Sequence, residues 1–167
     1  MDIASIKEYF TLANQNISFY LVIADDEEIV RRGLEDLIDW SEMGFELVAT
    51  FEDGDELIDY LKNNSVDVVF TDIKMMNVSG LDVAKFIYEN MPSTIVVIIS
   101  GYKEFEYAKK AIDYNVEHYI LKPTQFEEIT RIFTDIKAKL DKKREDEKTI
   151  LEFRQRYSEL IPIMQEQ

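Results

Sequence analysis

The stretch VDVVFT at residues 66–71 is dominated by β-branched and aromatic side chains, which predicts a buried β-strand. Four further runs of this kind recur along the chain: FYLVIA at 19–24, ELVATF at 46–51, TIVVIIS at 94–100 and HYIL at 118–121. The first, third and fourth runs in chain order are apolar almost throughout rather than alternating. Both faces of their sheet should therefore be covered, which is typical of parallel strands joined by right-handed helical crossovers.

The segments between these runs carry apolar residues at helical spacing, which predicts amphipathic helices. The clearest sets are Ile29, Val30, Leu34, Leu37 and Ile38, then Leu57, Ile58 and Leu61, then Phe105, Ala108, Ala111 and Ile112. Strands that alternate with helices in this way indicate an α/β fold, with a doubly wound parallel sheet and helices on both of its faces.

Composition limits the class of protein. The chain has 167 residues, of which 46% are hydrophobic, and a formal net charge of -15. This length fits one domain with appendages, and the acidic excess argues against direct nucleic-acid binding. Cysteine is absent, which excludes disulfides and thiolate metal sites. Because no run approaches a membrane span and no signal peptide is recognisable, we expect a cytoplasmic location without membrane contact.

Two appendages flank the predicted sheet. Residues 1–18 contain apolar residues that could form a short helix, namely Ile6, Tyr9, Phe10 and Leu12. A final core helix is expected from Phe126 to Leu140, followed by the charged stretch DKKREDEK at 141–148. Beyond it, a spacing of three and four residues separates Ile150, Phe153, Tyr157, Leu160 and Met164. Pro162 should end or kink any helix there. This tail is either a partner-binding helix or a connector that packs back on its own domain.

Polar side chains follow four of the predicted strands. Asp25 and Asp26 follow the first, Asp72 follows the third, Ser100 ends the fourth and Lys122 follows the fifth. Ligands of doubly wound sheets bind beyond the carboxyl ends of the strands, so these side chains should converge on one edge. Clustered carboxylates repel one another unless they bind a cation or hold a proton, and oxygen ligands of this kind suit Mg²⁺.

The predicted chemistry is attack by a carboxylate on a phosphoryl group. Asp72 is the best candidate nucleophile because it follows the central strand. Lys122 could pair with a carboxylate before the reaction and with a phosphoryl oxygen afterwards, and the Ser100 hydroxyl could turn toward the new anion. Taken singly, such residues are more often helix caps or solvated surface groups. Their joint placement in a regular alternation of strands and helices favours function.

The strings IADDEE, VVFTDIKMMNVSGLDV, IIS and YILKP resemble the receiver domain of bacterial two-component response regulators, over about residues 19–138. The resemblance implies a flavodoxin-like, five-stranded parallel sheet in the order 2-1-3-4-5, with helices on both faces. Residues 1–18 would then be an N-terminal extension, and residues 139–167 a C-terminal helical linker or tail.

The same resemblance assigns roles to the site residues. By it, Asp72 accepts the phosphoryl group and Lys122 contacts the phosphate. Ser100 and Tyr119 would form a switch pair, in which Tyr119 turns inward as Ser100 moves toward the phosphoryl group. The bond between Lys122 and Pro123 would be cis. The implied Mg²⁺ ligands are Asp25, Asp26, Asp72 and the backbone carbonyl of Lys74.

More narrowly, LIDWSEMGFELVATFEDGDE at 37–56 and SGYKEFEYAKKAIDYNVEHYILKP at 100–123 resemble receivers coupled to AraC-type helix-turn-helix output domains. This implies a signalling phosphoprotein, not an enzyme, that a sensor histidine kinase phosphorylates and that regulates transcription. DNA would be contacted only through an output domain, supplied by a longer chain or a partner protein. A homodimer could form through the C-terminal helix, or through the face made by the helix near 105–112, the strand at 118–121 and the last helix.

Three other functions share features with this sequence. A haloacid-dehalogenase-like phosphatase also forms an aspartyl phosphate, but its pattern requires a second Asp where this chain has Lys74. A flavodoxin-like cofactor carrier needs a Ser/Thr/Gly-rich phosphate loop where this chain has ADDEE. The third alternative is a receiver-shaped scaffold that works without phosphate. One departure from the receiver pattern is Met76, where proline is usual, and it could loosen the loop after Asp72.

Overall fold

The computed structural model describes residues 18–101 and 105–165. The chain forms two compact units, Met1–Ile129 and Thr130–Gln167. The short helix expected from Ile6, Tyr9, Phe10 and Leu12 lies outside the described residues.

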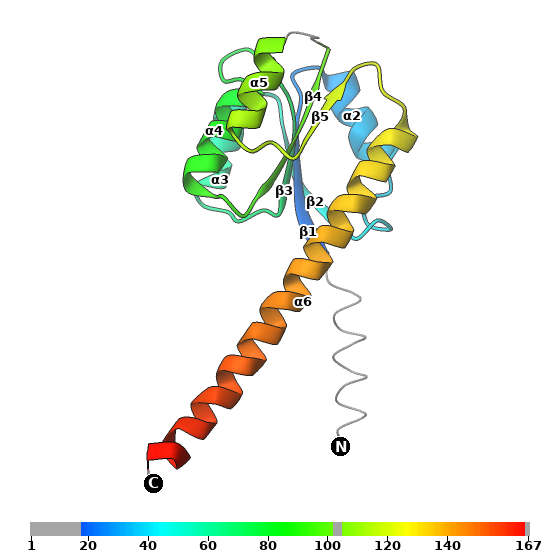
Figure 1. Ribbon diagram of the computed structural model, residues 1–167. Coiled ribbons are helices and arrows are strands. Elements are labelled where there is room, and N and C mark those ends of the chain that lie inside the picture. Colours follow the sequence, from blue (N-terminus) through cyan, green and yellow to red (C-terminus); the bar gives the residue numbers. More distant parts are fainter. Residues whose placement is uncertain (1–17, 102–104, 166–167) are drawn as a thin grey trace. The chain divides into compact units, whose positions relative to one another are not determined.

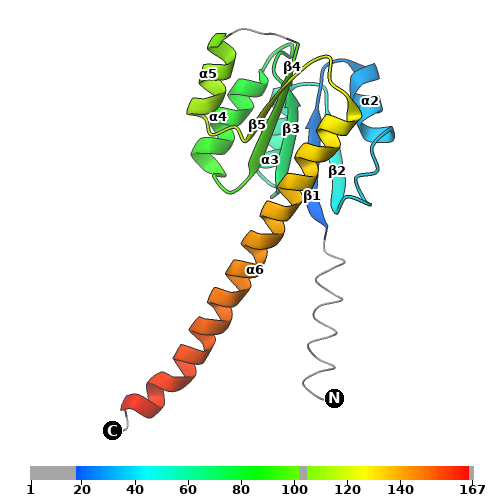
Figure 2. The ribbon, with the colours of Figure 1, turned by 45° about the vertical axis from the view of Figure 1, so that its right-hand side comes forward.

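Five parallel strands form one sheet. They are β1 (Phe19–Ala24), β2 (Phe45–Phe51), β3 (Val68–Asp72), β4 (Ile95–Ser100) and β5 (His118–Leu121). Their order across the sheet is β2-β1-β3-β4-β5, which can be followed in Figure 2. The predicted flavodoxin-like, doubly wound sheet is confirmed. Differences are small: β3 begins at Val68 rather than Val66, and Asp72 is its last residue rather than the residue that follows it.

The helices between the strands cover both faces of the sheet. They are α2 (Glu28–Asp36), α3 (Gly54–Leu61), α4 (Gly80–Asn90) and α5 (Phe105–Asp113). Figure 1 shows α2 on one face of the sheet and α3, α4 and α5 on the other. The central strands are therefore enclosed from both sides, as their continuous apolar sequence predicted.

The core lies between the sheet and these helices. The fully buried side chains of the central strands include Leu21, Val22, Ile23, Val68, Val69, Phe70, Val97 and Ile98. Each large apolar side chain buried in this way stabilises the fold by about 1.5–3 kcal/mol. The edge strands β2 and β5 are less buried. The sheet is thus a rigid support for whatever its ends carry.

The strand register brings three of the predicted site residues to one edge. Asp72 on β3 pairs with Ile99 on β4, so Ser100 follows one position further along. Ser100 in turn pairs with Leu121 on β5, and Lys122 follows directly. Since carboxyl ends of parallel strands meet at the same edge, the turn after β1 lies there too.

The last element is one continuous helix, α6 (Phe126–Gln165), which confirms the predicted helical extension. The charged stretch does not interrupt it, and an ion pair of 2.6 Å joins Lys137 and Asp141 one turn apart. Pro162 does not end the helix, because its missing N–H affects a hydrogen bond only in the last turn. Among the described residues, no helix is both long and apolar enough to cross a membrane.

Candidate functional site

An acidic turn joins β1 to α2. Asp25 is fully buried, and its Oδ1 accepts a 2.9 Å hydrogen bond from the backbone N–H of Glu27. Arg31 on α2 donates from Nη1 to the carbonyl oxygen of Asp25 at 2.7 Å, which fixes the turn from the other side. One carboxylate oxygen from each of Asp25, Asp26 and Glu27 lies within 4.8 Å of the others. The turn therefore presents three carboxylates in a small space.

Lys122 links this turn to the end of β3. Its Nζ lies 3.5 Å from Oδ2 of Asp72 and 3.3 Å from Oδ2 of Asp25. Asp72 is buried, and its Oδ1 accepts a 2.9 Å hydrogen bond from the N–H of Ile73. The backbone N–H of Lys122 donates to the carbonyl of Ser100 at 2.8 Å. The peptide bond to Pro123 is cis, as the resemblance implied.

The charges at this edge do not balance. Burial raises the pKa of Asp72 to about 6, and the negative charge of Asp25 adds to the effect while Lys122 opposes it. Burial also raises the pKa of Asp25, although the N–H of Glu27 and the charge of Lys122 lower it in part. For Lys122, burial lowers the pKa, but Asp25 and Asp72 outweigh it and the pKa is raised. Lys122 stays charged, and the carboxylates still carry an excess of negative charge.

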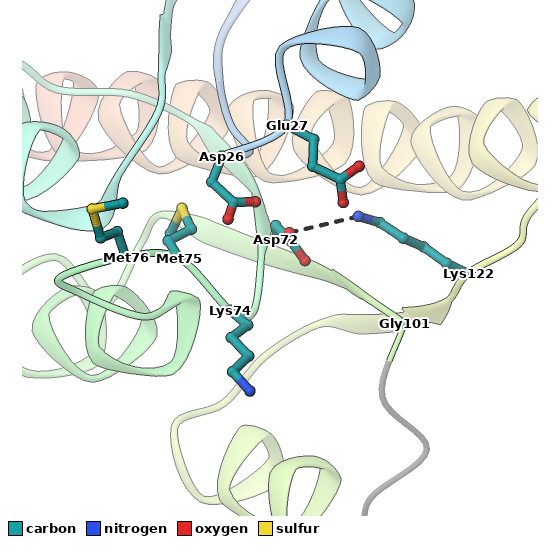
Figure 3. A pocket seen from close by; sticks show the side chains of 8 residues that line it. All are labelled: Asp26, Glu27, Asp72, Lys74, Met75, Met76, Gly101 and Lys122. Atoms are coloured by element: carbon teal, nitrogen blue, oxygen red, sulfur yellow. Dashed lines mark ion pairs between the residues drawn. The ribbon is translucent and has the colours of Figure 1, made fainter.

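A pocket of about 660 Å³ opens above these groups. It is lined by Asp26, Glu27, Asp72, Lys74, Met75, Met76, Gly101 and Lys122. In Figure 3 the carboxylates of Asp26, Glu27 and Asp72 and the ammonium of Lys122 face the same space, whereas the side chain of Lys74 points away. A small anion could therefore reach Asp72 with Lys122 beside it.

The chain turns sharply after Asp72. The N–H of Gly80 donates to the carbonyl of Ile73 at 2.8 Å, and Ser79 with Asp82 forms a capping box that starts α4. A Cβ on Gly80 would lie only 2.2 Å from the carbonyl oxygen of Asp72. Only glycine allows this approach, so the start of α4 holds the end of β3 directly.

The proposed switch residues lie on the neighbouring strands. Ser100 is fully buried at the end of β4, next to the strand that carries Asp72. Tyr119 on β5 pairs with Ile98 on β4, is half-buried and packs against the main apolar cluster. The fold thus places both residues near the acidic edge, within one or two strands of Asp72.

The acids at this edge fit a hard cation. Asp25, Asp26, Asp72 and Lys74 all lie around the pocket or directly beneath it, and their oxygen atoms are the ligand type that Mg²⁺ prefers. Glu27 was not predicted, yet it belongs to the carboxylate cluster and lines the pocket. Its signal was present in the string IADDEE, where a third acid follows the pair.

The fold and the site together define a class of protein. A parallel sheet in the order β2-β1-β3-β4-β5, with crowded carboxylates and a lysine at its carboxyl edge, is the arrangement of flavodoxin-like signal receivers. The sequence profile of the response regulator receiver domain matches residues 21–134. The chain therefore belongs to the response regulator receiver domain family of two-component systems.

Similar proteins include transcriptional regulators. The chain is 35% identical over 128 residues to the uncharacterized transcriptional regulatory protein YesN of Bacillus subtilis, covering 77% of this chain and 34% of that protein. It is 37% identical over 105 residues to the transcriptional regulatory protein HptR of Staphylococcus aureus, covering 63% of this chain and 41% of that protein. The chain thus matches between a third and a half of the length of these relatives.

Solved structures of receiver domains are similar as well. The receiver domain of AraT, a response regulator from Geobacillus stearothermophilus, has a TM-score of 0.71 and 38% identity, covering 77% of this chain and 99% of that one. The isolated receiver domain of RcsB from Salmonella enterica serovar Typhimurium, solved in the presence of the phosphomimetic BeF₃⁻, has a TM-score of 0.56 and 25% identity over 65% of this chain and 80% of that one.

Proposed function

We propose that this receiver domain accepts a phosphoryl group on Asp72, with Mg²⁺ as cofactor, and that phosphorylation changes an interaction surface. The observation that carries the proposal is the position of the Lys122 ammonium between two buried carboxylates, 3.5 Å from Asp72 and 3.3 Å from Asp25. The similar receiver of RcsB was solved with a phosphomimetic anion present, which supports an anion beside the acceptor here.

Asp72 acts as the nucleophile in its ionised form. With a pKa raised to about 6, this form predominates at neutral pH. A carboxylate oxygen attacks the phosphorus atom, the bond from phosphorus to the donor's leaving group breaks, and the leaving group departs with that electron pair. Bound Mg²⁺ would offset the charge of the carboxylates and of the incoming phosphoryl oxygens. The residues that would hold it are Asp25, Asp26, Asp72 and the carbonyl of Lys74, with Glu27 beside them.

Lys122 acts after the transfer as well as before it. Its ammonium pairs with Asp25 and Asp72 in the structure, and it is close enough to turn to an oxygen of a phosphoryl group on Asp72. A charge-assisted hydrogen bond of this kind contributes about 1.5–3 kcal/mol. The reactions we assign are acceptance of the phosphoryl group and its slow loss, so the role is signalling rather than turnover.

The structural response is assigned to Ser100 and Tyr119. A phosphoryl group on Asp72 places new acceptor oxygens at the strand edge, toward which the Ser100 hydroxyl can turn, and Tyr119 then moves inward. Two charge-assisted bonds, from Lys122 and Ser100, approach the roughly 5.5 kcal/mol that shifts a two-state equilibrium from 1:99 to 99:1. The available energy, about 3–6 kcal/mol in total, is therefore of the size that such a switch requires.

A sensor histidine kinase is the proposed phosphoryl donor. An apolar groove of about 500 Å³ opens beside the acidic pocket, and Lys122 belongs to both. Its lining includes Ile29 on α2, which is 87% exposed, and the half-exposed Phe126 at the start of α6. A donor domain must contact this rim to bring its phosphoryl group to Asp72, so we assign the groove to the kinase.

Regulation of transcription is proposed through an output domain, since the relatives are longer transcriptional regulators.

We also propose that a second copy of the chain pairs with this one along the C-terminal end of α6. Ile150, Phe153, Tyr157, Leu160 and Met164 are all exposed there with the spacing of a helix–helix seam. The alternative dimer would form through α5, β5 and α6. A cytoplasmic location and the division at 18 and 138 stay predictions.

The test is incubation of the purified chain with acetyl phosphate, with and without MgCl₂, followed by measurement of intact mass. We expect one added phosphoryl group on the wild type only when MgCl₂ is present, and none on Asp72→Asn. Asp36→Asn, which changes an exposed aspartate on α2, serves as the matched control and should react like the wild type. A folded wild type that gains no mass would instead indicate a phosphorylation-independent scaffold.

A further inference from the structure

The loop between β2 and α3 does not line the acidic pocket. It is nevertheless hydrogen-bonded to the two segments that do, the turn after β1 and the loop after β3. Among the described residues, none from Glu52 to Asp55 lines the acidic pocket. Asp53 in this loop is only 7% exposed. A buried carboxylate needs partners, and those of Asp53 identify what the loop holds.

The carboxylate of Asp53 reaches across to the loop that follows β3. Its Oδ2 accepts a 2.8 Å hydrogen bond from the N–H of Asn77, and its Oδ1 accepts a 2.9 Å bond from the N–H of Val78. Next to it, the N–H of Gly54 donates to the carbonyl of Val78 at 3.2 Å. These bonds join segments that lie 24 and 25 residues apart in the sequence.

Capping of α3 explains only part of this arrangement. Asp53 is the N-cap residue of α3 and accepts a 3.3 Å bond from the N–H of Asp55, which is sufficient for a cap. The bonds from Asn77 and Val78 are shorter and do not belong to α3. Burial raises the pKa of Asp53, but the three N–H donors outweigh it and hold the pKa below its usual value.

The bonded positions limit which part of the loop can move. On one side, the N–H of Gly80 holds the carbonyl of Ile73 at 2.8 Å, directly after Asp72. On the other side, Asp53 holds Asn77. The segment between these two anchors is Lys74 to Met76, and all three of its residues line the acidic pocket. The anchors therefore determine the path of the pocket's own rim.

We propose that Asp53 is a positioning residue, which fixes the segment Lys74 to Met76 and thereby sets the Lys74 carbonyl for a divalent cation. This inference rests on the proposed Mg²⁺ site at Asp72. Gly54 is required for the same reason, since a Cβ there would lie 2.5 Å from the carbonyl oxygen of Val78. A side chain at that position would push the two loops apart.

The same loop also supports the acidic turn. The carbonyl of Phe51, at the end of β2, accepts a 3.0 Å bond from the N–H of Asp25. Arg31, which donates to the carbonyl of Asp25, lies 3.5 Å from Glu52 through its second terminal nitrogen. Residues Phe51 to Asp53 therefore contact both the acidic turn after β1 and the loop after β3 that carries the Lys74 carbonyl.

The test compares Mg²⁺ binding in Asp53→Ala, Asp53→Asn and Asp67→Asn. Asp53→Asn keeps one side-chain oxygen that can accept a hydrogen bond from Asn77 or Val78, but replaces the other oxygen by an NH₂ group, which cannot accept one. Asp67 is the matched control, because its Oδ2 accepts a 2.7 Å bond from the N–H of Tyr20 near the opposite ends of the strands. The dissociation constant of MgCl₂ is measured by calorimetric titration, and stability by urea unfolding.

We expect Asp53→Ala to weaken Mg²⁺ binding by about tenfold or more, as is usual when a group that orients a metal ligand is removed. Asp53→Asn should recover part of that loss, and Asp67→Asn should lose stability with Mg²⁺ affinity unchanged. If both Asp53 variants lose stability but bind MgCl₂ like the wild type, Asp53 is only a helix cap and the inference is wrong. If the wild type binds MgCl₂ but accepts no phosphoryl group, the proposed function is wrong, whereas the positioning role of Asp53 still stands.

Discussion

Replacing Asp72 with asparagine should stabilise the metal-free fold at neutral pH, although it removes the proposed phosphoacceptor. Asp72 is buried, and its nearest cation, the ammonium of Lys122 at 3.5 Å, is shared with Asp25. Burial and the charge of Asp25 together raise the pKa of Asp72 to about 6. The ionised carboxylate therefore costs free energy of folding that a neutral amide of the same shape does not.

The sign and size of this effect follow from linkage. A carboxyl whose pKa is higher in the folded than in the unfolded state binds its proton more tightly when folded, so the free energy of unfolding falls as pH rises from 3.8 to about 6. The difference between these two values corresponds to roughly 3 kcal/mol. Since the pocket is open to water, which screens the charge, we expect Asp72→Asn to be more stable by about 1.5–3 kcal/mol above pH 7.

Urea unfolding with EDTA, repeated over a series of pH values, measures this difference. The wild type and Asp72→Asn should converge near pH 4 and separate as pH rises, whereas the exposed control Asp36→Asn should follow the wild type throughout. A difference that does not vary with pH, or a less stable Asp72→Asn at pH 7, would refute the assignment of repulsion and burial to this carboxylate. MgCl₂ should stabilise the wild type more than Asp72→Asn, because it binds the folded state through that charge.

Four further changes test other parts of the molecule. Gly80→Ala places a Cβ 2.2 Å from a backbone oxygen and should lower the free energy of unfolding by about 2–3 kcal/mol in urea, whereas Gly33→Ala, with its nearest neighbour at 4.0 Å, should be neutral or slightly stabilising. Ser100→Ala should still accept a phosphoryl group from acetyl phosphate but show a smaller change in amide hydrogen exchange, and a response equal to that of the wild type would exclude the switch. Ile29→Ala should slow phosphoryl transfer from whichever purified sensor histidine kinase in a panel phosphorylates the wild type, and leave the reaction with acetyl phosphate unchanged; equal slowing of both reactions speaks against the groove as the kinase surface. Phe153→Glu should convert a dimer to a monomer in size-exclusion chromatography with light scattering, and a dimer that persists would point to another face.

The strands could be predicted from sequence because their burial leaves a direct trace in composition. Each run of Val, Ile, Leu and Phe appears in the structure as a strand of the sheet, and only the bounds differ. At β3 the difference has a physical cause. The N–H of Tyr20 donates to the Asp67 side chain at 2.7 Å and not to a backbone carbonyl, although the backbone groups of Asp67 still bond to Tyr20 and Ile95, and the regular strand starts at Val68.

From the residue pattern alone, the candidate site was predictable at the ends of the strands, whereas Lys74 and Tyr119 came from the resemblance to receiver domains. Asp25, Asp72, Ser100 and Lys122 are found by reading the residue at each strand end, and the sheet brings those ends together. Asp53 gives no such signal, because its partners lie 24 and 25 residues away and only the folded loops bring them into contact. In the sequence alone it is one more acid in FEDGDE.

The edge of the sheet shows how stability and ligand binding are coupled in this fold. Backbone N–H groups of Glu27 and Ile73 hold the carboxylates of Asp25 and Asp72 in place, but hydrogen bonds of this kind do not neutralise a charge. Lys122 supplies one positive charge for both. The repulsion that remains disfavours the metal-free folded state, and a dication bound there would relieve it. The same negative charge therefore lowers the stability of the free chain and would raise its affinity for Mg²⁺ at the proposed site. A substitution that removes the repulsion should also weaken Mg²⁺ binding.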